Sequence, residues 1–303
     1  MAGFFAGLLV RALSALSPRA RARLASFVGG LAYGLRIRRR VALDNLRQAL
    51  PELPEARRRA IARGAYVNMA LAALEGLSSS SLKGEALEKA VVVERWELVE
   101  QALAGGKGML VATAHFGSWE LLGEVMARRG IPLNAVVRPL VGALNAKLME
   151  SRQQSGLKLI PGRGSISGSV KALAKNEVVA MLVDQVLPER NGVFVPFFGR
   201  PASTSPALSL AAIRSGAPVY VAMSAREGDH LRVFVEGPFP VERTGDRRRD
   251  VIEHTRRVTE VIEQYIRRYP EQWLWLHRRW KVQPTGNSWG DVGAPEADAE
   301  REG

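Results

Sequence analysis

His115 and Glu120 stand five positions apart in the segment Val-Ala-Thr-Ala-His-Phe-Gly-Ser-Trp-Glu. An imidazole that has one ring nitrogen held as N–H by a carboxylate can accept a hydroxyl proton at its other nitrogen. The pair therefore predicts a general base with an orienting acid. Four histidines among 30 acidic residues also produce this spacing by chance, so the spacing alone does not separate a catalytic pair from ordinary residues.

The local chain must bend for the two side chains to meet. On a regular helix, residues five apart point about 140° away from each other, because each turn has about 3.6 residues. His115 must therefore precede a helix and Glu120 must lie in its first turn. Gly117 permits a sharp bend. Ser118 is the predicted N-cap of a helix over 119–129.

The hydrophobic pattern changes along the chain and predicts an α/β fold. From Val91 onward, short β-branched runs alternate with helical segments, which is typical of a largely parallel central sheet flanked by helices. Helices are predicted over 3–16, 18–37, 39–50, 54–75, 96–104, 119–129, 142–154, 166–175, 207–214 and 246–269. Strands are predicted over 91–94, 108–114, 133–137, 157–161, 178–183, 217–225 and 231–236, with a loop after 183 to about 206.

The same pattern divides the chain into three parts. Residues 1–77 form a predicted helical, membrane-associating region, and 78–283 form the α/β domain. Residues 284–303 are rich in glycine, proline and acids and are expected to be a disordered acidic tail. We therefore expect the chemistry in the middle part, beyond the carboxyl ends of the strands.

The net charge of +13 is concentrated near the amino terminus. Residues 1–63 contain 13 arginines, no lysine and only 3 acids. Such a segment faces an anionic partner: nucleic acid, a phospholipid surface or an acidic protein. The chain has no cysteine, which excludes disulfides, thiolate metal sites and a cysteine nucleophile. No histidine pair has metal-ligand spacing, so neither a metal nor another cofactor is expected.

An apolar stretch, Leu24–Leu35, lies between two arginine clusters. Its large residues recur at helical spacing, as on a helix that rests in a membrane interface with guanidinium groups on lipid phosphates. A core helix with basic ends has the same pattern, so both interpretations stay open. No run of 18 uncharged apolar residues occurs, so a spanning helix is not expected.

Three further polar residues follow predicted strands. Arg138 can clamp a phosphate or stabilise an oxyanion, and Arg163 lies in a Pro-Gly-Arg-Gly turn that opens a helix, an arrangement suited to anions. Asp184, followed by Gln185, either orients a catalytic partner or caps a loop. Arg138 is equally interpretable as a surface arginine at a strand end, and the Pro-Gly-Arg-Gly turn around Arg163 is a weak motif by itself.

Aromatic residues gather in two later segments. Phe194, Phe197 and Phe198 either wall an apolar channel for an acyl chain or pack in the core. The segment Trp273–Lys281 places aromatic residues beside cationic ones. It can support the floor of the site, meet a lipid headgroup by cation–π contact, or line a nucleic-acid groove.

In order and spacing, these motifs resemble the bacterial lipid A late acyltransferases of the lysophospholipid/glycerolipid acyltransferase superfamily. The motifs that carry the resemblance are His-Phe-Gly-Ser-Trp-Glu at 115–120, Val-Arg-Pro at 137–139, Pro-Gly-Arg-Gly at 161–164, Asp-Gln at 184–185, Gly-Val-Phe-Val-Pro-Phe-Phe-Gly at 192–199 and Pro-Glu-Gln-Trp-Leu-Trp-Leu-His-Arg-Arg-Trp-Lys at 270–281. Mycobacterial mannoside acyltransferases are similar at the same motifs, so the resemblance leaves the acceptor open.

The resemblance implies an enzyme in which His115 is the base and Glu120 its orienting acid. It assigns acceptor or donor binding to Arg138, Arg163 and Asp184, and we add Gln185 to these substrate-binding candidates. The expected reaction moves a fatty acyl chain from acyl carrier protein, or acyl-CoA, to a hydroxyl of an anionic glycolipid such as a lipid A precursor. The missing cysteine and the missing Gly-x-Ser-x-Gly motif agree with transfer without a covalent enzyme intermediate.

The resemblance also sets the expected partners and location. We expect acyl carrier protein, the anionic acceptor and a membrane surface as partners, at the cytoplasmic face of the bacterial inner membrane, with peripheral or monotopic attachment. Alternatives are acylation of another membrane glycolipid or phospholipid, and a non-catalytic lipid-binding protein on the same fold. Nucleic-acid binding is motivated by charge alone and is not expected as a partner function.

Overall fold

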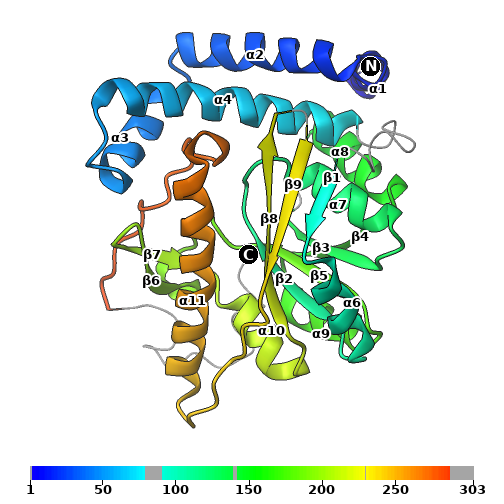
Figure 1. Ribbon diagram of the computed structural model, residues 1–303, viewed down its shortest axis with the longest axis vertical. Coiled ribbons are helices and arrows are strands. Elements are labelled where there is room, and N and C mark those ends of the chain that lie inside the picture. Colours follow the sequence, from blue (N-terminus) through cyan, green and yellow to red (C-terminus); the bar gives the residue numbers. More distant parts are fainter. Residues whose placement is uncertain (1, 79–90, 139–141, 229, 287–303) are drawn as a thin grey trace.

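The computed structural model describes residues 2–78, 91–138, 142–228 and 230–286 (Figure 1). Its centre is a seven-stranded sheet. In spatial order the strands are β1 (Val91–Glu94), β9 (His230–Glu236), β8 (Val219–Glu227), β2 (Met109–Thr113), β5 (Val178–Leu182), β3 (Leu133–Val137) and β4 (Lys158–Pro161).

The sheet is mostly parallel. Strands β8, β2, β5, β3 and β4 run in one direction, and β9 returns antiparallel to β8 with β1 parallel beside it. The predicted α/β class with a largely parallel sheet is therefore confirmed. The carboxyl ends of five strands meet at one edge, where ligands of such sheets bind.

Helices cover both faces of the sheet (Figure 1). They are α6 (Trp96–Ala104), α7 (Trp119–Arg128), α8 (Ala143–Gln154), α9 (Ser165–Leu173), α10 (Ala207–Ser215) and α11 (Arg247–Arg268). Strand β2 is buried on both sides: Leu110 and Ala112 join one hydrophobic cluster, and Met109 and Val111 join the other. This alternation follows from the two-residue period of a strand.

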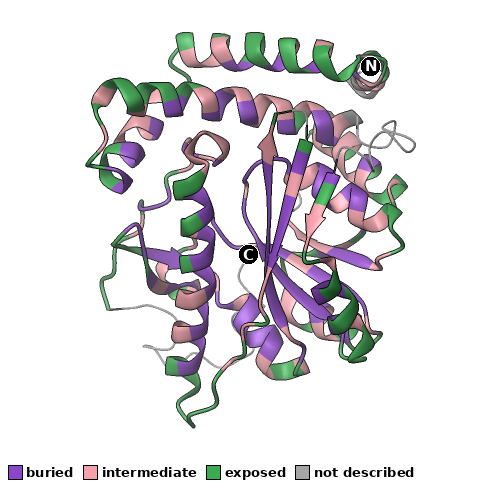
Figure 2. Ribbon diagram, viewed as in Figure 1, coloured by how far each residue is buried: buried purple, intermediate pink, exposed green. Residues whose placement is uncertain are grey.

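Among the described residues, four helices precede the sheet: α1 (Ala2–Ser14), α2 (Pro18–Gly34), α3 (Arg39–Ala49) and α4 (Glu55–Ser78). Figure 1 shows α2 lying along α4. At their closest approach is Gly29, where an added Cβ would lie 2.7 Å from the backbone nitrogen of Val67. On the side away from α4, α2 leaves Phe27 67% and Leu31 50% exposed, and Figure 2 shows this outer surface in green and pink.

The packing joins the helical region to the sheet. Leu46 of α3 and Ile61 of α4 are fully buried in the same cluster as Val179 and Val221 of the sheet. In the part of the chain that the structure describes, no helix is long and apolar enough to cross a membrane. Most of the predicted acidic tail, residues 287–303, lies outside the described residues.

Most predicted elements agree with the structure to within a few residues, but the predicted loop up to 206 is wrong in its second part. Strands β6 (Val193–Phe197) and β7 (Arg200–Thr204) form an antiparallel hairpin there. Its two-residue turn, Phe198 and Gly199, has φ of 53° and 70°, the positive values that the tightest hairpin turns require. Two short 3-10 turns, Glu189–Asn191 and η3 (Pro270–Gln272), complete the described elements.

Candidate active site

Two neighbouring strands bring His115 and Asp184 together, although the residues are 69 positions apart. Thr113 at the end of β2 pairs with Leu182 at the end of β5, and the backbone nitrogen of Val183 donates to the carbonyl of Thr113 at 3.0 Å. Both chains then leave the sheet at the same edge. The strand order therefore determines which acid reaches the histidine.

Asp184 binds His115 at two points. His115 Nδ1 lies 2.8 Å from Asp184 Oδ1, and the backbone nitrogen of His115 donates to Oδ2 at 3.0 Å. The Asp184 side chain is 2% exposed, whereas that of His115 is 23% exposed. An ionised carboxylate only accepts hydrogen bonds, so Nδ1 carries the proton and Nε2 keeps its lone pair when the ring is neutral. Gln185 Nε2 lies 3.3 Å from that second nitrogen.

The carboxyl-terminal aromatic segment fixes Asp184. The indole nitrogen of Trp273 donates to Asp184 Oδ2 at 2.9 Å, and Trp273 is fully buried. His277 Nε2 accepts a hydrogen bond from the backbone nitrogen of Val186 at 3.0 Å, and burial lowers the pKa of His277 to about 4. A neutral His277 can therefore hold the chain just after Asp184. Of the interpretations of Trp273–Lys281, support of the site floor is the one that these contacts bear out.

The prediction that Glu120 holds the ring of His115 is wrong in its geometry. Both carboxylate oxygens of Glu120 bind Arg152, at 3.0 and 2.5 Å, and Glu120 Oε1 also accepts from the indole of Trp119 at 2.9 Å. Asp184 occupies Nδ1 instead. Glu120 does lie in the first turn of α7, as predicted, and its charge acts on the imidazole without touching it.

Gly117 makes the turn after His115 possible. Its φ is +57°, and an added Cβ would lie 1.5 Å from the carbonyl oxygen of Ser224, so no other residue fits without moving the backbone. Ser118 precedes α7 at the N-cap position, but its side chain does not cap the helix. Its hydroxyl donates to Glu75 of α4 at 2.6 Å, which ties the turn to the helix above it.

The pKa values of the pair follow from this geometry. Burial disfavours the charged form of His115, but the negative charge and hydrogen bond of Asp184, together with Glu120, outweigh it and raise the pKa of His115 above 6.5. Burial disfavours ionised Asp184 as well, yet His115 and the indole of Trp273 lower the pKa of Asp184 to about 2. The arrangement is that of a strengthened imidazole base beside a permanently ionised acid.

Arg138 and Arg163 lie at the same sheet edge but farther along it. Arg138 follows β3 and Arg163 follows β4, and both are exposed. Among the described residues, no hydrogen bond or ion pair joins either of them to His115. Their assigned part in substrate binding stays a prediction.

The phenylalanines of the hairpin belong to an aromatic cluster. Phe197 and Phe198 are 1% and 5% exposed and pack on Trp273, with ring centroids 5.4 and 6.5 Å away. Trp280 stacks on Phe197 at 5.8 Å. Phe194 is half-buried on β6. This cluster supports the indole that binds Asp184, and the channel role of the three phenylalanines stays a prediction.

Two contributors to the site cannot be recognised from the sequence. Arg152, on α8, had no signal, because nothing in the spacing of a charged helix face shows that one arginine turns inward to Glu120. Trp273 was noted only within its aromatic segment, and the antiparallel bridge between Phe116 and Trp273 is what brings it to the site. Within the described ranges, no group of three His, Asp or Glu side chains is placed to hold a metal ion.

Comparison with known proteins identifies the family to which the chain is similar. Residues 1–282 match the family described as bacterial lipid A biosynthesis acyltransferase. The lipid A biosynthesis palmitoleoyltransferase of Escherichia coli K12 is 29% identical over 262 residues, which cover 84% of this chain and 82% of that protein. The lauroyltransferase of the same organism is 27% identical over 271 residues, 87% and 86% of the two chains. A phosphatidylinositol mannoside acyltransferase of Mycolicibacterium smegmatis is 26% identical over 204 residues, 65% and 63%.

Proposed function

This chain belongs to the bacterial lipid A biosynthesis acyltransferase family, and on that premise we propose that His115 is the general base of its acyl transfer. Membership makes the protein an acyltransferase of lipid A-type glycolipids. The observation that carries the proposal is the 2.8 Å contact between His115 Nδ1 and Asp184, which leaves Nε2 as the proton acceptor.

The proposed reaction needs no covalent enzyme intermediate. The acceptor hydroxyl displaces the Gln185 amide at His115 Nε2 and gives its proton to that nitrogen as its oxygen attacks the thioester carbon. The tetrahedral intermediate collapses with cleavage of the carbon–sulfur bond. The imidazolium returns the proton to the leaving thiolate, so an ester and a free thiol are formed. Asp184 stabilises the transient imidazolium and keeps its ring oriented.

We assign the acyl donor to acyl carrier protein in preference to acyl-CoA. The support is electrostatic: the chain carries a net charge of +13, and acyl carrier proteins are acidic in general, so the opposite charges favour encounter. The acceptor we propose is the hydroxyl of an anionic lipid A precursor. Similarity to mannoside acyltransferases supports a mannosylated lipid as the alternative acceptor.

The outer face of α2 supports attachment to a membrane surface. Phe27, Val28 and Leu31 are 43% to 67% exposed on that helix, and Leu35, just after it, is 66% exposed. Arginines lie at both ends of this apolar stretch. Apolar side chains between cations are what an interfacial helix presents to acyl chains and lipid phosphates. We propose a peripheral or monotopic enzyme at the cytoplasmic face of the bacterial inner membrane.

The test compares wild type, His115→Ala and His230→Ala. His230 is an exposed histidine on β9, so its removal controls for the loss of an imidazole. Each protein is incubated with an acyl carrier thioester or acyl-CoA and with a lipid A precursor or a phosphatidylinositol mannoside, and the lipids are weighed by mass spectrometry. We expect an added acyl chain with wild type and His230→Ala only. Equal product from His115→Ala would remove the base assignment.

A further inference from the structure

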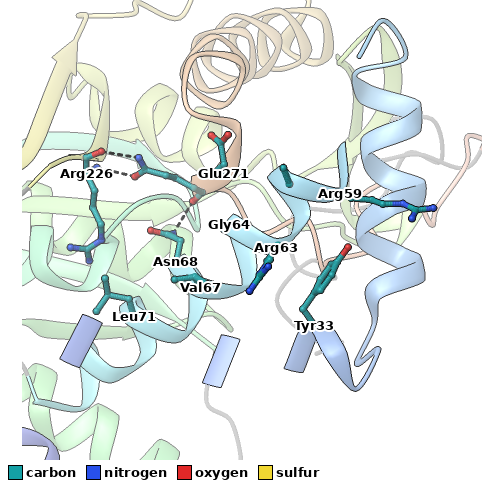
Figure 3. Close-up of a pocket in the computed structure, with 11 residues that line it drawn as sticks. Tyr33, Arg59, Arg63, Gly64, Val67, Asn68, Leu71, Arg226 and Glu271 are labelled. Atoms are coloured by element: carbon teal, nitrogen blue, oxygen red, sulfur yellow. Dashed lines mark hydrogen bonds between the residues drawn. The ribbon is translucent and has the colours of Figure 1, made fainter. Parts of the chain in front are cut away.

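A cavity of about 690 Å³ lies between α4, the end of α2 and η3, outside the site described above (Figure 3). Four of its lining residues, Arg59, Arg63, Val67 and Leu71, recur every four positions and therefore form one stripe along α4. The stripe is about 18 Å long, at 1.5 Å per residue. It is cationic at one end and apolar at the other.

The cationic end of the stripe consists of Arg59 and Arg63, whose positive charges are not fully paired within the described residues. Arg63 is exposed, and its side chain has no hydrogen bond or ion pair among the described residues. The Arg59 side chain is 64% exposed. Its Nε lies 3.5 Å from Glu55 Oε1, which is a longer contact than the 2.7 Å between Arg47 and the same oxygen. Arg59 and Arg63 lie one helical turn apart on α4, and two arginine side chains at that spacing can turn toward one phosphate and bind it with paired hydrogen bonds.

The other charged groups of the cavity are already matched. Glu271 pairs with Arg57 at 2.6 Å, so it does not neutralise the stripe. The Arg226 side chain pairs with Glu75, and its backbone N–H already donates to Gln272 Oε1 at 2.8 Å, so that donor is not open to a ligand. The anion preference of the cavity therefore rests on the two arginines of α4.

The position of the cavity indicates a lipid in preference to a soluble anion. Tyr33, which lines one wall, is on α2, the helix that exposes Phe27 and Leu31 on its outer face. The apolar end of the stripe, Val67 and Leu71, offers a surface for an acyl chain on α4, the helix that packs against the opposite face of α2. A lipid with a phosphate headgroup matches the stripe, because its phosphate suits the cationic end and its acyl chain suits the apolar end.

The cavity is separated from the catalytic turn by one side chain. Asn68, which lines the cavity, donates to the carbonyl oxygens of Gly117 and Gln272, at 3.1 Å each. His115 does not line the cavity, so an occupant would lie behind the His115 turn. It is a different molecule from the reacting lipids.

We propose that this cavity binds an anionic phospholipid of the membrane, with its phosphate between Arg59 and Arg63 and one acyl chain along Val67 and Leu71. The site would hold the protein to the membrane beside α2 and brace the wall that Asn68 shares with the catalytic turn. The inference rests on the proposed membrane attachment but not on acyl transfer.

The test is titration calorimetry on the full-length protein with dihexanoyl phosphatidic acid below its micelle concentration. Arg59→Gln/Arg63→Gln should weaken binding about tenfold, because both phosphate partners are lost. Lys107→Gln/Lys171→Gln removes two exposed cations elsewhere and should leave the affinity within about twofold. Leu71→Ser should weaken the phosphatidate severalfold through the chain contact.

Two other probes and one kinetic measurement decide the source of the anion. Dihexanoylglycerol, which lacks phosphate, and glycerol 3-phosphate, which lacks chains, should both bind at least tenfold more weakly than the phosphatidate. Equal binding of glycerol 3-phosphate would overturn the lipid assignment in favour of a soluble phosphate. Unchanged phosphatidate binding by Arg59→Gln/Arg63→Gln, with a raised KM for the acyl carrier, would overturn it in favour of a donor-docking surface.

The two proposals fail separately. Calorimetry needs no turnover, so an inactive protein can still bind the phosphatidate at this cavity. Conversely, loss of binding in every protein would leave the His115 product assay unaffected. Thermal unfolding of each variant checks that the exposed substitutions on α4 preserve the fold.

Discussion

The sheet edge that carries His115 and the outer face of α2 differ in how far other residues of the chain satisfy or cover their side chains. At the edge, buried Asp184 receives three hydrogen bonds, from the ring and backbone of His115 and from Trp273. On α2, Phe27 is 67% exposed and Leu31 50% exposed. One region is complete within the chain, and the other presents apolar surface that the described residues leave uncovered.

The first region takes its geometry from folding alone, and the second is stabilised only by contact with something outside the described residues. A buried ionised acid is stable only when its hydrogen bonds are satisfied, so the His115–Asp184 geometry must form as the protein folds. Exposed apolar residues on α2 gain free energy only when something covers them. We therefore expect substitutions at the edge to change chemistry, and substitutions on α2 to change where the protein is found.

The largest expected effect is the loss of the base. His115→Ala should lower the rate of acyl transfer by about 10⁴-fold, at the upper end of what general-base catalysis contributes. Membrane binding should stay as in wild type. The measurements are initial rates of lipid acylation and flotation with vesicles. A parallel loss of flotation would show that the two regions are not independent.

The second effect is a change in both rate and pH dependence. Asp184→Asn should lower the rate by about 10³-fold, since a neutral amide orients the ring poorly and does not stabilise imidazolium. Because Asp184 raises the pKa of His115 and the neutral ring is the proposed base, wild-type activity should fall as pH drops, with a midpoint above 6.5. Without that carboxylate the pKa of His115 falls, so the acid limb should move to lower pH.

A rate–pH profile for both proteins checks the sign. The matched control is His254→Ala, which removes a buried imidazole that binds Ser209 at 2.8 Å and lies outside the site. Its acid limb should coincide with that of wild type. An unmoved limb in Asp184→Asn would show that Asp184 does not set the pKa of the base.

The sequence predicted the strands that position the site better than the contacts within it. Val91–Glu94 and Leu133–Val137 were predicted to the residue, because β-branched runs with clear ends determine them. The hairpin after Val193 was missed because Pro196 reads as a strand breaker and a Phe198 with positive φ has no local signal. Turn conformation there depends on tertiary packing.

Local sequence also does not show which acid contacts His115, because that contact depends on tertiary structure. Glu120 is close to His115 in sequence, and the sheet order that makes β2 and β5 neighbours is a property of the whole fold. Asp184 was identified as an acid at a strand end that either orients a catalytic partner or caps a loop. Only the register of the two strands selects the first role.

The next prediction concerns α2. Phe27→Gln/Leu31→Gln should reduce the fraction bound to anionic vesicles by about tenfold or more, because burying each large apolar side chain contributes about 1.5–3 kcal/mol when complete. Acyl transfer to a detergent-solubilised acceptor should be unchanged. Val92→Gln removes another exposed apolar residue, 46% exposed on β1, and is the control. Equal binding of all three proteins would contradict a membrane role for α2.

The smallest expected effect separates the two acids at the catalytic edge. Glu120→Gln removes a charge that raises the pKa of His115, but Glu120 acts without a hydrogen bond to the ring, whereas Asp184 acts through charge and contact together. The acid limb of the rate–pH profile should therefore move to lower pH by less than in Asp184→Asn. Any fall in the rate itself would follow from releasing Arg152, which Glu120 binds with both oxygens. A shift of the limb as large as that of Asp184→Asn would return the orienting role to Glu120, since only direct contact with the imidazole in the working enzyme gives the two acids equal influence on its proton.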